Sequence, residues 1–259
     1  MPALDRQLWH DRAIVGVSLL AIAMVAWLYL LHLSATMPGM EMADMPAMVM
    51  PRVHAWDPLD VGLLFVMWAV MMIAMMVPAA APMVLTFAMV QRKRQEQDRA
   101  TVPTVGFLLG YALVWTAYAA VAALAQWGLH EAGLLSAAMA STSTRLGGAL
   151  LLVAGVFQWT PVKQACLAKC RSPFSFVMTE WREGRAGAFV MGVRHGAYCV
   201  ACCWALMALL FVAGVMNLLW IAGLAILVLA ERVLPGGTGV SRVVGGLLLL
   251  AGVVLLVRG

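Results

Sequence analysis

The chain has little charge and none of the motifs that mark a soluble nucleotide-dependent enzyme. Only 11% of its 259 residues are charged, against about 25% in an average soluble domain. A P-loop, a Rossmann fingerprint, a nucleophile elbow and a c-type haem motif are all absent from the sequence. The chain therefore lacks the nucleotide-binding domain of a primary pump. We assign no catalytic residues and expect a binding protein rather than an enzyme.

Apolar residues dominate what is present, at 64% of the chain with a mean hydropathy of +0.92. Runs of about 18 or more such residues are typical of transmembrane helices, and strand-like alternation is absent. The fourth run is short, and its start is left open between residues 134 and 145. We predict an all-α, polytopic transmembrane helix bundle of about seven helices, forming one integral membrane domain over residues 1–259. The expected helices are 13–33, 59–76 with a continuation to 90, 102–127, 145–159, 188–212, 216–234 and 243–257.

Lysine and arginine are distributed unevenly between the expected connections. With a cytoplasmic N-terminus, fourteen of the 17 lie on one side, and only Arg52, Arg145 and Arg258 lie on the other. Cytoplasmic loops carry the excess of these residues, so we predict a cytoplasmic N-terminus. In a Gram-negative bacterium the protein would lie in the inner (cytoplasmic) membrane, with residues 34–58 in the periplasm. The net charge of +5 then reflects topology and indicates no nucleic-acid partner.

The first apolar run is interpreted as an anchor helix. A cleaved signal peptide is the alternative, but the apolar region of a signal peptide spans about 7–15 residues. Residues 13–33 form a longer run, and no convincing small-x-small cleavage site follows it.

The expected outer loop, residues 34–58, is rich in methionine. Pro38, Gly39, Pro46 and Pro51 interrupt any continuous helix there, so the thioethers are predicted to face water. Soft thioether sulfur selects Cu(I) among biological ions. A flexible linker that happens to be methionine-rich is the alternative. The candidate ligands are Met37, Met40, Met42, Met45, Met48 and Met50.

A second set of methionines lies in the second expected helix. Four-residue spacing stacks side chains on one helical face, although packing explains such a stripe as readily as metal binding does. Pro78 and Pro82 are expected to kink or interrupt the helix and to free backbone carbonyls. The two rows are Met67, Met71 and Met75 on one face, and Met72 and Met76 on the next; the candidate metal ligands are Met71, Met72, Met75 and Met76.

The most specific pattern lies in the fifth expected helix. His195, Cys199 and Cys203 are spaced by four residues and share one face, which Cys202 borders. Imidazole, thiolate and thioether ligands together suit Cu(I), with zinc as the second choice. At about 1.5 Å per residue, these cysteines and residues 71–76 fall at similar depths, so the two sulfur faces would meet if the helices touch.

The expected cytoplasmic loop, residues 160–187, is amphipathic and holds the other two cysteines. Cys166 and Cys170 share a face of a helical turn. Cationic neighbours favour thiolate, so the pair is a candidate handover point for a soft metal. Two unconnected cysteines on an interfacial helix are the alternative. Glu231, at the inner end of the sixth helix, is expected to form a boundary ion pair.

Three segments of the chain resemble a known family. They are Met-Met-x-x-Met-Met-x-Pro-x-x-x-Pro at 71–82, Trp-Thr-Pro-x-Lys-x-x-Cys-x-x-x-Cys-Arg-x-Pro at 159–173 and His-Gly-x-Tyr-Cys-x-x-Cys-Cys-Trp at 195–204. They resemble an uncharacterised family of predicted metal-binding bacterial integral membrane proteins. The resemblance covers most of the chain from the second helix onward. It implies a polytopic membrane protein associated with metals and supplies no reaction.

Our leading hypothesis is a Cu(I)-binding integral membrane protein that takes part in copper transport, copper delivery or the assembly of a copper enzyme. The expected partners are the lipid bilayer, the copper ion, and a copper chaperone or a membrane copper enzyme. One alternative is a membrane thiol–disulfide oxidoreductase that uses Cys199 and Cys202. Another is an accessory subunit of a membrane copper oxygenase. Copper content distinguishes the oxidoreductase from the other two.

Overall fold

The computed structural model describes residues 2–36, 58–95, 104–135 and 141–258. Outside its helices this part of the chain has one isolated β-bridge, between Leu135 and Ser141, and no strand. The expectation of an all-α helix bundle is confirmed. The helices are α1 (Pro2–Thr36), α2 (Pro58–Gln95), α3 (Thr104–Glu131), α4 (Thr144–Trp159), α5 (Pro161–Arg171), α6 (Pro173–Glu180), α7 (Gly184–Ala208), α8 (Leu210–Ala213), α9 (Leu218–Val233) and α10 (Gly237–Arg258).

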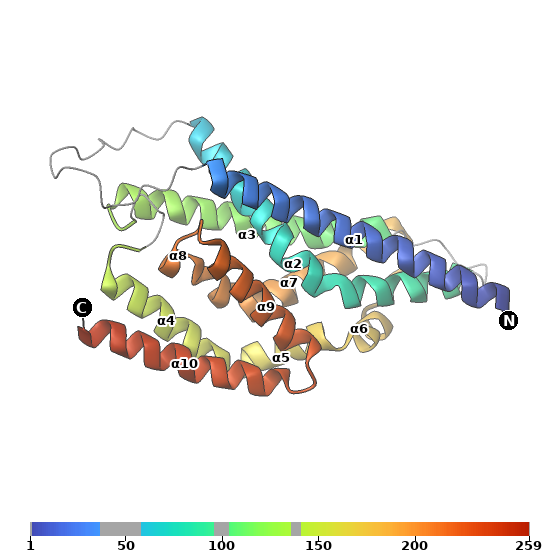
Figure 1. Ribbon diagram of the computed structural model, residues 1–259. Helices are drawn as coiled ribbons and strands as arrows, with labels where there is room; N and C mark the ends of the chain where they lie inside the picture. The colour runs from blue at the N-terminus through green and yellow to red at the C-terminus, as the bar shows by residue number, and fades with distance from the viewer. Residues whose placement is uncertain (1, 37–57, 96–103, 136–140, 259) are drawn as a thin grey trace.

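The long helices lie side by side along one axis (Figure 1). Helices α1, α2 and α3 pack in order on one side, α4 pairs with α10 on the other, and α7 and α9 lie between them. In the apolar stretch Gly184–Ala213, which contains α7, 56% of the most apolar window is buried, against 17% in α10. A site on α7 is therefore shielded on most sides by other helices.

Five of these helical segments are long and apolar enough to cross a membrane, which is compatible with a membrane protein. They contain α1, α2, α3, α7 and α10. Helices α4 and α5 meet at a bend of 66°, and together they would form a sixth span. Every apolar run expected from the sequence contains a helix. The open start of the fourth run is settled by Ser143, whose side chain accepts a hydrogen bond from the Leu146 N–H and caps α4.

The two ends of the bundle differ in charge. Helix α2 finishes with Arg92, Lys93 and Arg94. Arg94 Nη2 lies 2.9 Å from a carboxylate oxygen of Glu183, the residue before α7. The end of α2 and the beginning of α7 therefore lie together, and we call this the basic end. The opposite end holds the beginning of α2 and the end of α3.

Helix α2 remains helical through both of its prolines, so of the two expected effects, a kink or an interruption, the interruption does not occur. Pro78 has no N–H to offer the carbonyl of Ala74, four residues earlier. Trp27 Nε1 of α1 donates to that carbonyl oxygen at 3.2 Å instead. Because a neighbouring helix satisfies the freed carbonyl, the helix continues and its methionine rows keep their register.

Candidate metal centre

Helix α7 carries its imidazole and thiols in the interior of the bundle. His195, Cys199, Cys202 and Cys203 are each at most 1% exposed. Helix α3 covers one side of α7, and α4, α5 and α9 contact it elsewhere. All five cysteines of the chain are free thiols in this structure. The soft donors of α7 therefore lie in an environment without bulk water.

Two glycines bring α3 and α7 into close contact. A Cβ atom on Gly110 of α3 would lie 2.2 Å from the carbonyl oxygen of Phe189, and one on Gly192 of α7 would lie 2.0 Å from that of Phe107. Side chains larger than hydrogen do not fit between these backbones, as is common where membrane helices cross closely. The contact places the next turns of α3 directly against the thiols of α7.

The Cys199 sulfur is surrounded by hydrogen-bond donors from two other helices. Trp115 Nε1 of α3 lies 3.2 Å from Sγ, and Arg232 Nη2 of α9 lies 2.8 Å from it. Indole and guanidinium N–H groups only donate, so Sγ accepts from both. The Tyr111 hydroxyl lies 3.1 Å from the same sulfur and 3.3 Å from the carbonyl oxygen of Met76. Such a set of donors suits an anionic thiolate better than a thiol.

Arg232 gathers the remaining thiols around one charged group. Its Nη2 lies 3.6 Å from Cys202 Sγ and 3.8 Å from Cys203 Sγ, and both thiols also donate to the carbonyl oxygen of Cys199. Cys170 of α5 is buried nearby, close enough to Cys202 for the two thiols to influence each other. Within the described residues, Nε and Nη1 of Arg232 have no hydrogen-bond partner. A buried cation is costly unless it is paired, and here its neighbours are sulfurs.

His195 lies one turn before Cys199 and is enclosed by aromatic rings. Its ring centroid is 5.9 Å from that of Phe107, 5.6 Å from that of Tyr111 and 5.4 Å from that of Phe176. Neither imidazole nitrogen has a hydrogen-bond partner in the part of the chain that the structure describes. Buried polar groups without partners are rare in native proteins and call for a reason. A ligand that is absent here, such as a metal ion, is one such reason.

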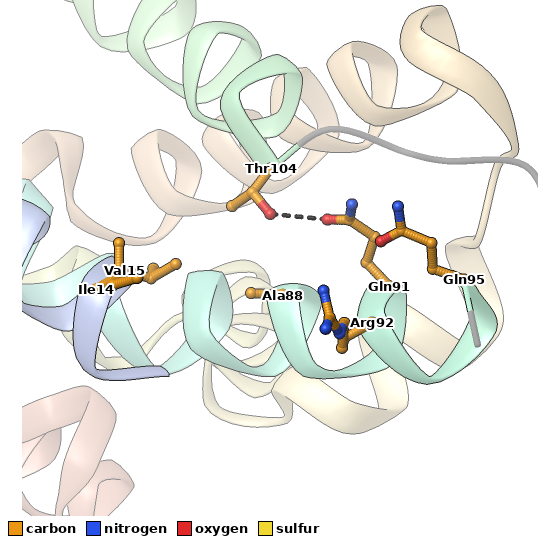
Figure 2. A pocket seen from close by; sticks show the side chains of 7 residues that line it. All are labelled: Ile14, Val15, Ala88, Gln91, Arg92, Gln95 and Thr104. Carbon is orange, nitrogen blue, oxygen red and sulfur yellow. Dashed lines mark hydrogen bonds between the residues drawn. The ribbon is translucent and has the colours of Figure 1, made fainter. Parts of the chain in front are cut away.

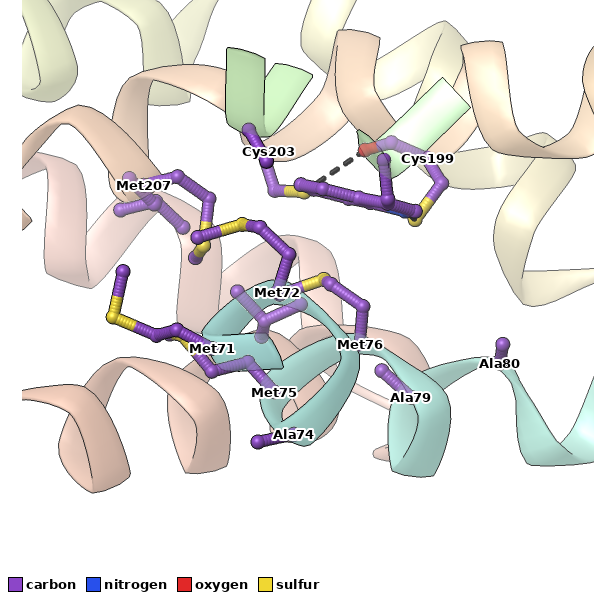
Figure 3. Close-up of a cluster of buried hydrophobic side chains, with 14 of the residues drawn as sticks. Met71, Met72, Ala74, Met75, Met76, Ala79, Ala80, Cys199, Cys203 and Met207 are labelled. Carbon is purple, nitrogen blue, oxygen red and sulfur yellow. Dashed lines mark hydrogen bonds between the residues drawn. The ribbon is translucent and has the colours of Figure 1, made fainter. Parts of the chain in front are cut away.

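Thioethers of α2 complete the sulfur-rich region. Figure 3 shows the side chains of Met72 and Met76 directed toward Cys203 and Cys199, with Met207 of α7 beside them. Met207 was not singled out from the sequence. The Tyr111 hydroxyl of α3 bridges the two helices, since it contacts both the Met76 carbonyl oxygen and the Cys199 sulfur. The methionine face of α2 is therefore turned toward the thiols of α7. The four candidate methionines of α2, all at most 1% exposed, are Met71, Met72, Met75 and Met76.

Residues 160–187, expected as a loop, contain helices α5 and α6 folded against the bundle. Cys170 is only 7% exposed, whereas Cys166 is half-buried. Two of the cations expected to favour thiolate there are engaged elsewhere. Lys163 Nζ lies 2.7 Å from a carboxylate oxygen of Glu231, and both side chains are buried. Arg171 donates to the main-chain carbonyl of Glu231 at 3.0 Å. The expected ion pair of Glu231 is present, near the end of α9, and both of its side chains are buried within the protein.

A cavity of about 250 Å³ lies at the basic end, away from the sulfurs (Figure 2). Ile14 and Val15 of α1 line one side of it, and the side chains of Gln91 and Thr104 are hydrogen-bonded across another at 2.9 Å. Its lining contains no sulfur. The cavity therefore plays no part in the candidate centre.

The structure brings together only part of the predicted ligand set. Among the described residues, no three His, Cys, Asp or Glu side chains are arranged to hold a metal ion. Arg232 lies where the thiols converge. The six methionines at 37–50 lie outside the described residues. Sequence reasoning missed Arg232, Tyr111 and Trp115. The sequence singles them out only as polar or charged residues within apolar runs, and such residues are often functional in membrane helices.

Comparison with known proteins gives one match. The model of the PpoB2 family, described as copper chaperone, matches residues 65–255. No curated protein and no solved structure matches the chain. The matched region begins within α2 and ends within α10, so it contains every described residue of the sulfur-rich centre. The chain belongs to the PpoB2 family of copper chaperones.

Proposed function

We propose that this protein is a multi-pass protein of the bacterial inner membrane that binds Cu(I) between α2 and α7 and delivers it to a partner. The centre consists of the thiols of Cys199, Cys202 and Cys203, the thioethers of Met72 and Met76, and the imidazole of His195, with Met71 and Met75 behind them. The partner is a copper enzyme or a second copper chaperone.

The observation that supports this proposal is the burial of α7 thiols and α2 thioethers in one cluster. Soft sulfur ligands favour Cu(I) over the harder biological cations. Copper(I) accepts few ligands, so a pair of thiolates with one thioether is sufficient. Water is excluded from all of these side chains. Such an environment protects Cu(I) from solvent during its passage through the protein.

Arg232 supplies the charge that such a complex needs. Copper(I) bound by a pair of thiolates carries a net negative charge, and a buried negative charge is costly unless it is paired. The guanidinium of Arg232 lies 2.8 Å from Cys199 Sγ, and Glu231, the adjacent residue, is paired with Lys163 instead. The guanidinium thus remains available to offset the charge of the complex.

Capture of copper is proposed to begin at the methionine-rich segment, on the periplasmic side. Its thioethers at residues 37–50 lie outside the described residues. The segment directly precedes α2, whose first half carries Met67 and Met71. Copper bound by the segment is therefore close in sequence to the methionine rows of the centre.

A thiol–disulfide oxidoreductase is the second candidate. Cys199 and Cys202 are the pair expected from the sequence, and Cys170 is buried close to Cys202. This grouping supports the candidate, because a disulfide requires its two sulfurs to be neighbours. In that case the pair exchanges electrons with a partner thiol or quinone and binds no metal.

The test is anaerobic titration of the detergent-solubilised protein with Cu(I) against a colorimetric chelator, with X-ray absorption to identify the ligands. We expect near-stoichiometric copper in a sulfur-rich environment and protection of the thiols from alkylation. Cys199→Ser should lose this copper, whereas Met191→Leu, equally buried on the same helix, should retain it. Absence of bound copper together with a titratable Cys170–Cys202 couple would favour the oxidoreductase.

A further inference from the structure

We propose that Cu(I) crosses the bundle along a continuous row of sulfur atoms, from Met67 near the opposite end to Cys166 at the basic end. We call this row the sulfur relay. It rests on the proposed function, because it takes Cu(I) as the cargo, and it extends that function from binding to movement across the membrane. The members of the sulfur relay are Met67, Met71, Met75, Met72, Met76, Met207, Cys203, Cys199, Cys202, Cys170 and Cys166.

The first part of the sulfur relay follows α2. Met67 lies nine residues into the helix, and Met71 and Met75 follow at intervals of four residues. At about 1.5 Å per residue, each step advances roughly 6 Å along the helix. These methionines are buried in one cluster with Met207 and the thiols of α7. Long, flexible thioethers allow an ion to exchange between neighbours without meeting water.

The middle part is the thiol group around Arg232. Three sulfurs, those of Cys199, Cys202 and Cys203, lie between 2.8 and 3.8 Å from its Nη2. These three sulfurs therefore lie in one region of the bundle, around a shared cation. Copper can pass among them by exchange of one ligand at a time, and the fixed cation keeps the region close to neutral at each step.

The last part leads to the surface of the basic end through α5. Cys170 is buried close to Cys202, and Cys166 lies one turn earlier on the same helix. Every other member of the sulfur relay is at most 7% exposed, but Cys166 is half-buried. The 66° bend between α4 and α5 turns α5 away from the direction of α4 and leaves this thiol accessible. Cys166 is therefore the residue at which a partner would receive or supply the ion.

A second exit along α7 is less favourable. From Cys199 it would lead through His195 to Met191, which is also fully buried. The rings of Phe107, Tyr111 and Phe176 surround His195, and Met191 Sδ already accepts a hydrogen bond from the Arg182 N–H at 3.3 Å. The α5 exit offers a thiol at each step, so the sulfur relay takes that direction.

The test measures copper binding and copper movement separately. Full-length protein is reconstituted in lipid vesicles that contain an entrapped Cu(I) chelator, and Cu(I) is added outside without oxygen and with an ionophore to dissipate the membrane potential. We expect wild-type vesicles to accumulate Cu(I) faster than protein-free vesicles. Cys166→Ser should reduce uptake to the protein-free rate while the detergent-solubilised variant still holds copper at the buried centre. Met191→Leu, the matched control, should change neither quantity.

The outcomes separate the sulfur relay from the proposed function. If the wild type binds Cu(I) in detergent but does not accelerate uptake, the relay is wrong and the binding centre stands. If the wild type binds no copper, the proposed function fails and the relay with it. Normal uptake by Cys166→Ser, or a block by Met191→Leu alone, would place the exit on α7 and overturn the route through α5.

Discussion

The guanidinium of Arg232 lies 2.8 Å from the sulfur of Cys199, deep between α7 and α9. This contact joins residues 33 positions apart and puts a fixed positive charge at the point where the thiols converge. It explains how thiolates are tolerated in an apolar bundle, because buried charges require a partner. If the cation is removed, the charge of a bound Cu(I)–thiolate complex is no longer offset, so its affinity should change.

Arg232→Met should weaken Cu(I) binding by about tenfold to a hundredfold. A hydrogen bond to a charged group contributes about 1.5–3 kcal/mol, and each 1.4 kcal/mol corresponds to about tenfold in affinity. Competitive titration with a Cu(I) chelator measures the change. Arg194→Met is the control, because Arg194 is 45% exposed and pairs with Glu180 outside the centre. Tighter binding in Arg232→Met would mean that the guanidinium competes with copper instead of supporting it.

Lys163→Met should destabilise the bundle by about 3–5 kcal/mol, since it leaves the Glu231 carboxylate buried without its partner. Thermal or denaturant unfolding in detergent measures the loss. Glu183→Gln removes the exposed ion pair with Arg94 and should cost less than about 1 kcal/mol. Equal effects of the two substitutions would contradict the assignment of Lys163–Glu231 as a buried structural pair.

Gly110→Ala should separate α3 from α7, because its Cβ would lie 2.2 Å from the carbonyl oxygen of Phe189. Overpacking of this kind costs about 1–3 kcal/mol or more. It should also draw Tyr111 and Trp115 away from Cys199 and make that thiol easier to alkylate. Gly128→Ala, on the same helix with nothing within 4 Å of the added atom, should leave both stability and alkylation unchanged.

Replacement of all six methionines at 37–50 by leucine should weaken capture of Cu(I) without unfolding the helices. Thioethers need not lose a proton to bind a metal, whereas thiols must. The copper held by this segment should therefore persist as the pH falls, while copper held by the cysteines is released. Titrations of the wild type and the variant at neutral and acid pH check both points. If the wild type and the variant bind Cu(I) with the same affinity at each pH, the segment is only a linker.

The predicted orientation is tested with engineered thiols. In intact cells, Ala43→Cys should react with an impermeant maleimide, and Gln95→Cys, beside the arginines that end α2, should not. The physical reason is the excess of lysine and arginine at the basic end, which favours a cytoplasmic location. The reverse pattern would invert the topology and the direction of every transfer proposed above.

Much of the architecture was predictable because it is encoded locally. Hydropathy over about 18 residues predicts each long helix, and four-residue spacing places Cys199 and Cys203 one turn apart. The same local pattern put Met72 and Met76 on a single face. At the prolines of α2, local rules allow either a kink or an interruption, and they do not say which of the two occurs. The hydrogen bond from Trp27 to the freed Ala74 carbonyl comes from another helix.

By itself, then, the sequence determined the helices, their apolar character and the rows of soft donors along α2 and α7. Only the tertiary structure decided which groups surround those donors. Arg232 reaches Cys199, Trp115 donates to it, and Cys170 turns inward to Cys202. These contacts depend on how far apart the helices lie and how each is rotated about its axis. Close approaches such as that of α3 at Gly110 set the distance between helices and their rotation. Neither can be predicted from the spacing of residues along one helix.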